Sequence, residues 1–334
     1  MKLKYIVIFA LVLASFSVKA QDPIFSQATF VPETLNPGFA GFEDKGRVHA
    51  GILSRLQWPG LESRISTQYA FLNQSFEGRN LDFGLGVNAQ WQYESFNNYN
   101  FFQFNGAYAY RLNLSQHSII RPAIEVGLGN KSNRFRNLTL GDQININTGV
   151  INPISVDPLG NNTSSAMYFD FSTGLVFERK EIGNNDISYW IGASVKHINR
   201  PDISFVDGEK VPLDIFMSLH GNYTFPVKND YLVTISGNYM RQGEADRFDI
   251  GSFLNYGEFI FGVTAATNPA RNTPNSHLLT SMNGFIGIEF TQFRFGISYD
   301  KNVSKLGNTQ GVYEFSMTYL SRCRNCNTRR GRKK

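Results

Sequence analysis

The sequence predicts an all-β fold, a transmembrane antiparallel outer-membrane β-barrel of about 14 strands with a polar and partly plugged lumen. Three observations predict it: apolar and polar residues alternate over runs of about 9 to 13 residues, the apolar faces are rich in Phe and Tyr, and the opposite faces carry Gly, Ser, Asn, Gln and Asp. A soluble antiparallel sandwich would also alternate. The barrel is favoured because these polar faces resemble a wet lumen more than a surface of Lys and Glu, and because only a closed barrel satisfies every backbone hydrogen bond in lipid.

Residues 1–20 have the features of a secretory signal peptide. Lys2 and Lys4 form a basic start, an apolar run follows from Tyr5 to Val18, and Ala20 ends the cleavage site. The run is short for a spanning helix, which needs about 20 residues, and no cysteine follows the site to indicate a lipoprotein anchor. The sequence therefore predicts export, cleavage after Ala20 and residence in the outer membrane.

Residues 21–45 are predicted to form an N-terminal segment that is periplasmic or plugs the barrel. Its prolines prevent a regular helix or a central strand, while its phenylalanines provide apolar anchors that a free tail would not need. We therefore expect this segment to pack on the periplasmic end of the barrel or to enter its lumen. The prolines are Pro23, Pro32 and Pro37, and the phenylalanines are Phe25, Phe30, Phe39 and Phe42.

Residues 46–320 carry the alternating runs that predict the barrel itself. From Leu81 to Tyr93 the odd-numbered residues are apolar, and those between them are Asp, Gly, Asn or Gln. The runs from Leu213 to Phe225 and from Tyr313 to Tyr319 alternate in the same way. Further runs begin near Arg47, Arg64, Tyr99, Ser118, Ala166, Asp186, Tyr231, Arg247, Glu258, Ser281 and Gln292.

The connections between these runs predict an orientation. With the N-terminus in the periplasm, the links after even-numbered strands lie inside, and two of them are tight, at residues 228–230 and 256–257. The outward links include the polar stretch at residues 131–165 and the sequences "NRPDISFVDGEKVP" and "NPARNTPNSHLL". Short turns inside and long loops outside are the usual asymmetry of such barrels. An even number of strands then places both termini in the periplasm.

Residues 321–334 form a basic tail that is expected to be periplasmic. The formal charge of the chain is +5, but residues 1–20 contribute three lysines and the last 13 residues contribute seven basic side chains without an acid, so the body carries −5. In the periplasm the tail would meet acidic surfaces of a partner protein, a lipid headgroup or the cell wall, and no nucleic acid. A solvated tail without a partner is the alternative. The basic residues are Arg322, Arg324, Arg329, Arg330, Arg332, Lys333 and Lys334.

A single CxxC pair, Cys323 and Cys326, lies in this tail. One such pair is half of a zinc site, so metal binding would need a second pair from a partner. A disulfide within the pair is favoured in an exported chain. A linkage to another protein and a shared metal site are the alternatives.

No residue pattern predicts catalysis, a metal or a cofactor. The histidines have no metal-binding spacing such as HExxH. His220 lies on a polar face near Asp214 and Ser218, but without a GxSxG elbow a hydrolase is a weaker interpretation than a plain lumen histidine. The chain is therefore expected not to be an enzyme. The histidines are His49, His117, His197, His220 and His277.

Charged residues of both signs fall on the predicted lumen faces. This mixture favours salt-bridged packing across a closed lumen over a selectivity ring, and a channel for small or hydrophobic solutes remains the alternative function. These residues are Asp82, Glu94, Arg121, Glu125, Asp170, Glu289, Arg294 and Asp300.

The start of the exported chain, "QDPIFSQATFVPETLNPGFAG", followed by "RVHAGILSRLQWPGL", resembles the amino-terminal signature of the PorP/SprF family of type IX secretion system outer-membrane proteins from Bacteroidetes-type bacteria. The resemblance is specific over about 40 residues, and it includes Leu35, Phe39 and Arg55. It implies a barrel of the type IX secretion and gliding apparatus, with periplasmic ring or anchoring proteins and a secreted surface adhesin as partners. Some members are needed for a single large cargo. The candidate signature or partner-contact residues are Asp22, Pro23, Phe25, Ser26, Gln27, Asn36, Pro37, Ala40, Gly41, Gln57 and Trp58.

Overall fold

The structure is a computed structural model, and it describes most of the chain after position 20. The described residues are 21–42, 46–77, 81–134, 139, 141–146, 148–156, 163–180, 187–205, 208–228, 231–269, 279–303 and 309–322. The expected signal peptide, both cysteines and the tail after Arg322 lie outside these residues.

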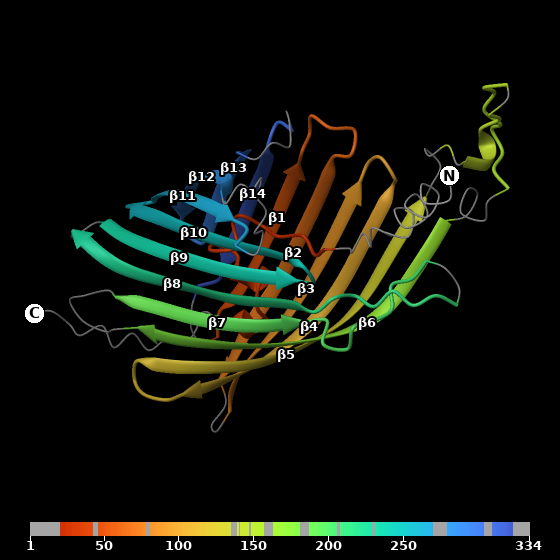
Figure 1. Ribbon diagram of the computed structural model, residues 1–334. Coiled ribbons are helices and arrows are strands. Elements are labelled where there is room, and N and C mark those ends of the chain that lie inside the picture. The colour runs from red at the N-terminus through yellow and green to blue at the C-terminus, as the bar shows by residue number, and fades with distance from the viewer. Residues whose placement is uncertain are drawn as a thin grey trace, which may run out of the picture.

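Fourteen antiparallel strands form one closed barrel, as the sequence predicts. Consecutive strands pair along the chain, and β1 closes the barrel against β14, with His49 opposite Leu320 and Gln57 opposite Val312 (Figure 1). The strands are β1 (Val48–Gln57), β2 (Ile65–Glu77), β3 (Asp82–Glu94), β4 (Tyr99–Asn113), β5 (Ser118–Arg134), β6 (Thr163–Lys180), β7 (Ser188–Lys196), β8 (Phe216–Lys228), β9 (Tyr231–Gln242), β10 (Ala245–Tyr256), β11 (Phe259–Thr267), β12 (Leu279–Phe290), β13 (Phe293–Asn302) and β14 (Val312–Leu320).

The expected strand starts differ from the observed ones by at most three residues, with the largest differences at β6 and β8. At β8 the alternating run begins at Leu213, but the strand begins at Phe216. Leu213 instead donates its backbone N–H to Pro201 and is buried with Phe101 and Ile203. The residues before β8 therefore cover the mouth of the barrel instead of extending its wall.

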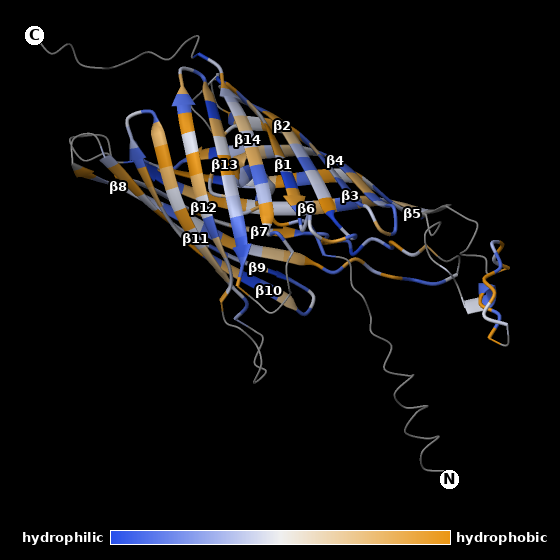
Figure 2. Ribbon diagram, turned by 90° about the horizontal axis from the view of Figure 1, so that it is seen from above, coloured by the Kyte–Doolittle hydropathy of each residue, from blue (hydrophilic) through white to orange (hydrophobic). Residues whose placement is uncertain are grey.

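The two faces of the wall differ in polarity, as Figure 2 shows by the alternation of apolar and polar residues along the strands. The outward side chains of β11 to β13 include Val263, Ile286 and Ile297, each more than 60% exposed. Polar residues such as Asn283 and Ser298 lie on the inward face and are buried, and they share it with the aromatic Phe285. An apolar outside and a polar inside are the faces expected of a wall that meets lipid.

Connections of different length define the two ends of the barrel. The link after every even-numbered strand is short, with only residues 257–258 between β10 and β11, where Gly257 has a φ of 57°. Several links after odd-numbered strands are long, with residues 135–162 between β5 and β6 and residues 197–215 between β7 and β8. We call these the short-connection end and the long-connection end.

Regular helices contribute little to the part of the chain that the structure describes. The short 3₁₀ turns are η1 (Pro32–Thr34), η2 (Pro37–Phe39) and η4 (Gly141–Gln143). Among the described residues, no helix is long and apolar enough to cross a membrane.

Candidate functional site

Residues 21–42, which we call the lumen segment, run through the inside of the barrel. At one end Asp22 lies beside His197, which follows β7, and its backbone N–H donates to the side chain of Gln242 at the end of β9. At the other end the carbonyl oxygen of Phe42 accepts a hydrogen bond from Arg121, near the start of β5. The segment therefore spans the lumen from the long-connection end to the short-connection end.

This path differs from the expectation that both ends of the exported chain are periplasmic. The backbone N–H of Ser321, after β14, donates to Val48 at the short-connection end. Asp22 lies at the opposite end, because His197 binds its carboxylate there at 2.7 Å. Asp22 and Ser321 thus lie at opposite ends of the barrel.

The Ser26-Gln27 pair is bound by a buried carboxylate. The backbone N–H groups of Ser26 and Gln27 both donate to Glu314 of β14, each at 2.9 Å. Arg55 of β1 lies opposite Glu314 in register and forms an ion pair with it. The side-chain amide of Gln27 donates to Ser298 at 3.0 Å. A buried carboxylate is costly unless it is paired and hydrogen-bonded, and here it receives both an arginine and two backbone donors.

The Ser26 hydroxyl also donates to Asp300, and Ser316 donates to the side-chain oxygen of Gln27. Gln27 is only 1% exposed. Strands β13 and β14 therefore bind this pair through both its backbone and its side chains.

Asn36 is the most deeply buried polar residue of the lumen segment, with an exposed fraction of 0%. Its amide nitrogen lies 3.1 Å from the carbonyl of Leu175, 3.0 Å from that of Ala193, and 3.1 Å from Nε2 of His220. Its side-chain oxygen accepts the backbone N–H of Gly38 at 2.8 Å, which caps η2. One side chain thus links the segment to β6, β7 and β8.

Two wall glycines provide the space for this asparagine. A Cβ atom on Gly174 would lie 2.0 Å from Oδ1 of Asn36, and one on Gly192 would lie 3.0 Å from its amide nitrogen. Glycine in a strand often marks a place where another backbone or a ligand approaches closely. Neither glycine was identified from the sequence, although each is a position without a side chain within a predicted strand.

Phenylalanines anchor the segment between these polar contacts. The ring of Phe30 stacks on that of Phe285, with centroids 4.0 Å apart, and meets the edge of Phe253 at 5.0 Å. Phe39 packs edge-on against Trp190, with centroids 4.9 Å apart. These apolar contacts agree with the anchoring that the sequence suggests for this stretch.

The short-connection end fits closely around Ala40 and Gly41. Gly41 has a φ of 64°, and a Cβ on Gly84 of β3 would lie 2.0 Å from the carbonyl oxygen of Ala40. Arg121 forms an ion pair with Glu178 at 2.7 Å while donating to the Phe42 carbonyl. The segment leaves the lumen through this fitted exit.

A carboxylate–imidazole–carboxylate chain fixes the long-connection end. His197 lies 2.7 Å from Asp22 through Nε2 and 2.9 Å from Asp170 through Nδ1. Burial by itself lowers the pKa of His197, but the two carboxylates outweigh this effect and raise it to about 9. Burial by itself raises the pKa of Asp22, but the charge and hydrogen bond of His197 bring it well below its usual range. The imidazole of His197 between these two carboxylates is therefore protonated at neutral pH.

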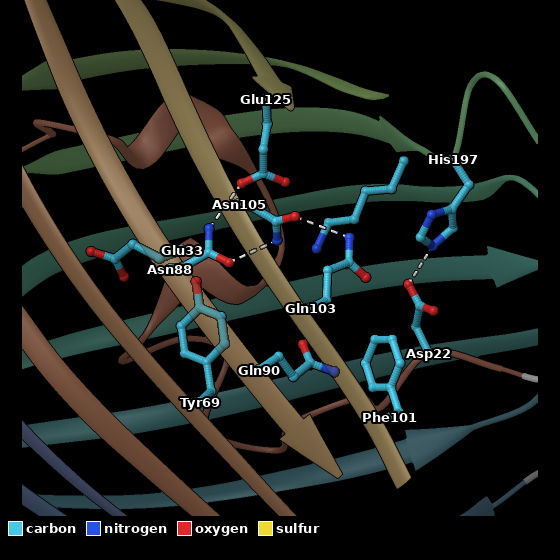
Figure 3. Close-up of a pocket in the computed structure, with 11 residues that line it drawn as sticks. Asp22, Glu33, Tyr69, Asn88, Gln90, Phe101, Gln103, Asn105, Glu125 and His197 are labelled. Carbon is cyan, nitrogen blue, oxygen red and sulfur yellow. Dashed lines mark hydrogen bonds and ion pairs between the residues drawn. The ribbon is translucent and has the colours of Figure 1, made fainter. Parts of the chain in front are cut away.

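A small polar cavity remains beside the segment, with room for only a few water molecules. Figure 3 shows its lining, where Asn105 lies between Gln103 and Asn88, and Asn88 in turn contacts Glu125. Two buried atoms at the cavity, Oη of Tyr69 and Oε2 of Glu33, have no hydrogen-bond partner within the described part of the chain.

The structure divides the predicted lumen charges into two groups. Arg121, Glu125, Asp170 and Asp300 are buried inside the barrel. The others lie at strand ends: Glu289 pairs with Arg294 beside a turn, Asp82 accepts from Asn113, and Glu94 accepts the backbone N–H groups of residues 96 and 97. The ion pair between Arg55 and Glu314 was not predicted. Both residues lie on the polar faces of their strands, and these strands, β1 and β14, are neighbours only because the barrel closes.

Among the predicted signature residues, those of the lumen segment from Phe25 to Gly41 lie inside the barrel, most of them buried. Gln57 accepts hydrogen bonds from Arg55 at 3.1 and 3.3 Å, next to the Glu314 ion pair. Trp58 begins the β1–β2 turn with a φ of 56° and donates its backbone N–H to Gly311. The signature residues therefore lie in the lumen segment and at the end of β1.

The His220 arrangement does not form a hydrolase site. Ser218 lies 3.2 Å from Nδ1 of His220, but its hydroxyl also contacts Ser194, and Nε2 of His220 meets Asn36. Asp214 lies beside Arg200, at 3.6 Å. Among the described residues, no cluster of three or more His, Cys, Asp or Glu side chains could hold a metal ion.

Comparison with known proteins gives a family match over most of the chain. Residues 17–319 match the family described as type IX secretion system membrane protein PorP/SprF. No curated protein matches the sequence. Three of the solved structures that resemble this chain are barrels with low sequence identity to it. The CymD monoaromatic hydrocarbon channel has 10% identity, covers 92% of this chain and 95% of its own, and gives a TM-score of 0.49. The P. putida toluene transporter TodX has 9% identity, coverages of 87% and 93%, and a TM-score of 0.45. The KdgM porin has 9% identity, coverages of 81% and 98%, and a TM-score of 0.36.

Proposed function

Because the chain belongs to the PorP/SprF family of type IX secretion system membrane proteins, we propose that this outer-membrane barrel assists the export or surface attachment of secreted proteins such as adhesins. The family match carries this proposal, and this is a family of membrane barrels and not of enzymes. Its partners would be the periplasmic ring or anchoring proteins of the secretion apparatus and a secreted surface protein.

The occupation of the lumen by this segment supports a role in binding and assembly over one in free passage of solutes. The lumen segment crosses the barrel, and its residues Gln27, Asn36 and Phe39 are each at most 1% exposed. A solute channel needs an open path with binding weak enough for release. The segment would have to leave before such a path existed.

Deletion of the gene tests the proposal. We expect one or more particular proteins to disappear from the cell surface while the outer membrane stays intact, and gliding to fail where those proteins support it. An unchanged surface proteome and unchanged motility would refute the proposal. Solute-dependent conductance of the purified full chain in a planar bilayer would favour the solute channel instead.

The basic tail is proposed as the contact with the periplasmic apparatus. Removing Arg322 to Lys334 should abolish co-purification of periplasmic partners while the barrel, which closes at Leu320, stays folded. Within the tail, Cys323 and Cys326 are proposed to form a disulfide. Thiol labelling of the purified protein before and after reduction tests this, since labelling without reductant would show free thiols.

A further inference from the structure

The barrel wall binds the lumen segment largely through the segment's own backbone. Glu314 accepts two backbone N–H groups, as described above. Lys196 donates to the carbonyl of Thr34 at 2.7 Å, and Ser194 donates to the carbonyl of Leu35 at 2.6 Å. Backbone hydrogen bonds supplemented by pockets for selected side chains are the usual way in which a protein recognises an extended peptide.

The selected side chains occupy defined places in the wall. The Gln27 amide meets Ser298 and Ser316, Phe30 enters the aromatic pair of Phe253 and Phe285, and Asn36 fills the space over the wall glycines. Gln27 and Asn36 are nine residues apart along the chain, so the site extends along much of the segment.

The closed sheet does not depend on the segment for its backbone pairing. Each strand pairs with its two neighbours, and β1 pairs with β2 and β14. The segment continues into β1 only at its short-connection end, and in the part of the chain that the structure describes its backbone joins no strand ladder. It therefore occupies the lumen as a ligand would, apart from the one covalent connection.

The wall also carries polar groups that this occupant does not use. Oη of Tyr69, Oδ1 of Asn238 and Nδ2 of Asn283 are buried and find no hydrogen-bond partner among the residues that the structure describes. Tyr69 borders the small cavity, and the two asparagines are at most 6% exposed. Buried polar groups are normally satisfied, so the segment leaves part of the hydrogen-bonding capacity of the wall unused.

We propose that the lumen is a binding site for an extended peptide that carries Phe-Ser-Gln followed by Asn-Pro-Gly, occupied here by the chain's own segment and available to a partner protein's segment of the same chemistry. The proposal deepens the proposed function, on which it rests for the identity of the partner, by locating the surface that the partner would enter. The partner's segment would take the path of the chain's own segment, between Asp22 at the long-connection end and Phe42 at the short-connection end.

An exchange experiment on the full chain tests this proposal. A protease site is inserted between residues 42 and 46, the protein is folded and purified in detergent, and the site is then cut so that the segment remains only by non-covalent contacts. A fluorescent synthetic peptide of residues 21–42 is added in excess. We expect it to replace the cut segment with one-to-one stoichiometry, measured by fluorescence anisotropy and by size-exclusion chromatography.

Peptide variants test the recognition, and they avoid any effect on barrel folding. Gln27→Ala and Asn36→Ala peptides should each bind at least about tenfold more weakly, because each loses buried hydrogen bonds. A Thr29→Ala peptide is the matched control and should bind within about twofold of the native peptide. A peptide that keeps only Phe-Ser-Gln and Asn-Pro-Gly, at their native spacing on an alanine background, should compete, and a scrambled peptide should not.

Two results would overturn the proposal. One is a cut segment that never exchanges, which would make it a fixed part of the wall. The other is equal binding of the native, Gln27→Ala and scrambled peptides. Because the assay uses purified protein, its failure is distinguishable from failure of the proposed function, which is measured on the cell surface.

Discussion

Replacing Asn36 with alanine should increase the fraction of molecules in which the lumen segment is released from the wall. The asparagine amide donates to wall groups on β6, β7 and β8, and its oxygen caps η2. A buried hydrogen bond contributes about 0.5 to 1.5 kcal/mol net. The NH₂ group has two hydrogens, so we count two of its three contacts and add the bond that caps η2. Loss of these three hydrogen bonds should weaken docking of the segment by about 3 kcal/mol.

Limited proteolysis of the detergent-solubilised protein measures this change. When opening is fast relative to cleavage, the cleavage rate follows the population of the open form. A loss of about 3 kcal/mol corresponds to roughly a 100-fold higher rate of cleavage within the segment. Asn113→Ala is the matched control, because Asn113 is exposed and makes only a 3.3 Å contact with Asp82, and its cleavage rate should stay within about twofold of the native rate.

A second variant tests the same reasoning while keeping the asparagine. In Gly174→Ala the added Cβ would lie 2.0 Å from Oδ1 of Asn36. This variant should therefore also raise the rate of cleavage within the segment. Cleavage of both Asn36→Ala and Gly174→Ala within about threefold of the native rate would refute the conclusion that Asn36 fastens the segment.

Three further predictions concern the charges and the ends of the chain. The pKa of His197 rises from 6.5 to about 9 and that of Asp22 falls, so protection of the segment from protease should be full between about pH 4 and 6.5. It should decline as the pH rises from 6.5 to 9 or falls below about 4. His197→Gln should remove the alkaline decline, and an unchanged pH profile in this variant would contradict the role given to His197. Glu314→Gln leaves a buried arginine without its carboxylate and should lower the free energy of unfolding by about 3 kcal/mol; a melting temperature equal to the native one would argue against this. A small tag before Asp22 should be labelled on intact cells, while one after Arg322 should be labelled only after permeabilisation, and the reverse pattern would show the opposite orientation.

The barrel could be predicted from the sequence because its signal is local. Alternation with period two from Leu81 to Tyr93 defines the two faces of a strand without reference to any other strand. The prediction was least accurate at Leu213, where alternation continues although the chain has turned across the mouth of the barrel. Burial against Phe101 and Ile203 produces that pattern as well as a strand does.

The site could be predicted only in part, because it depends on contacts between residues far apart in the sequence. Asn36 and Gln27 were identified through the family resemblance, but their partners, Gly174 and Glu314, follow more than 100 residues later. The direction of the segment depends on the contact between Asp22 and His197, which no local pattern reveals. The two ends of the chain were therefore placed on the same side.

The position of Glu314 has a consequence for the order in which the molecule assembles. Glu314 and Arg55 face each other across the β1–β14 seam, which is where the first strand meets the last and the ring becomes complete. If the ring closed first, residues 21–42 would have to thread end-on into a closed interior, as the free peptide does in the exchange experiment. Arrival of the segment before closure avoids threading and places Ser26 and Gln27 against the carboxylate as the last ladder forms. In that order of events the segment would assist barrel closure, and a chain without residues 21–42 should form its barrel more slowly.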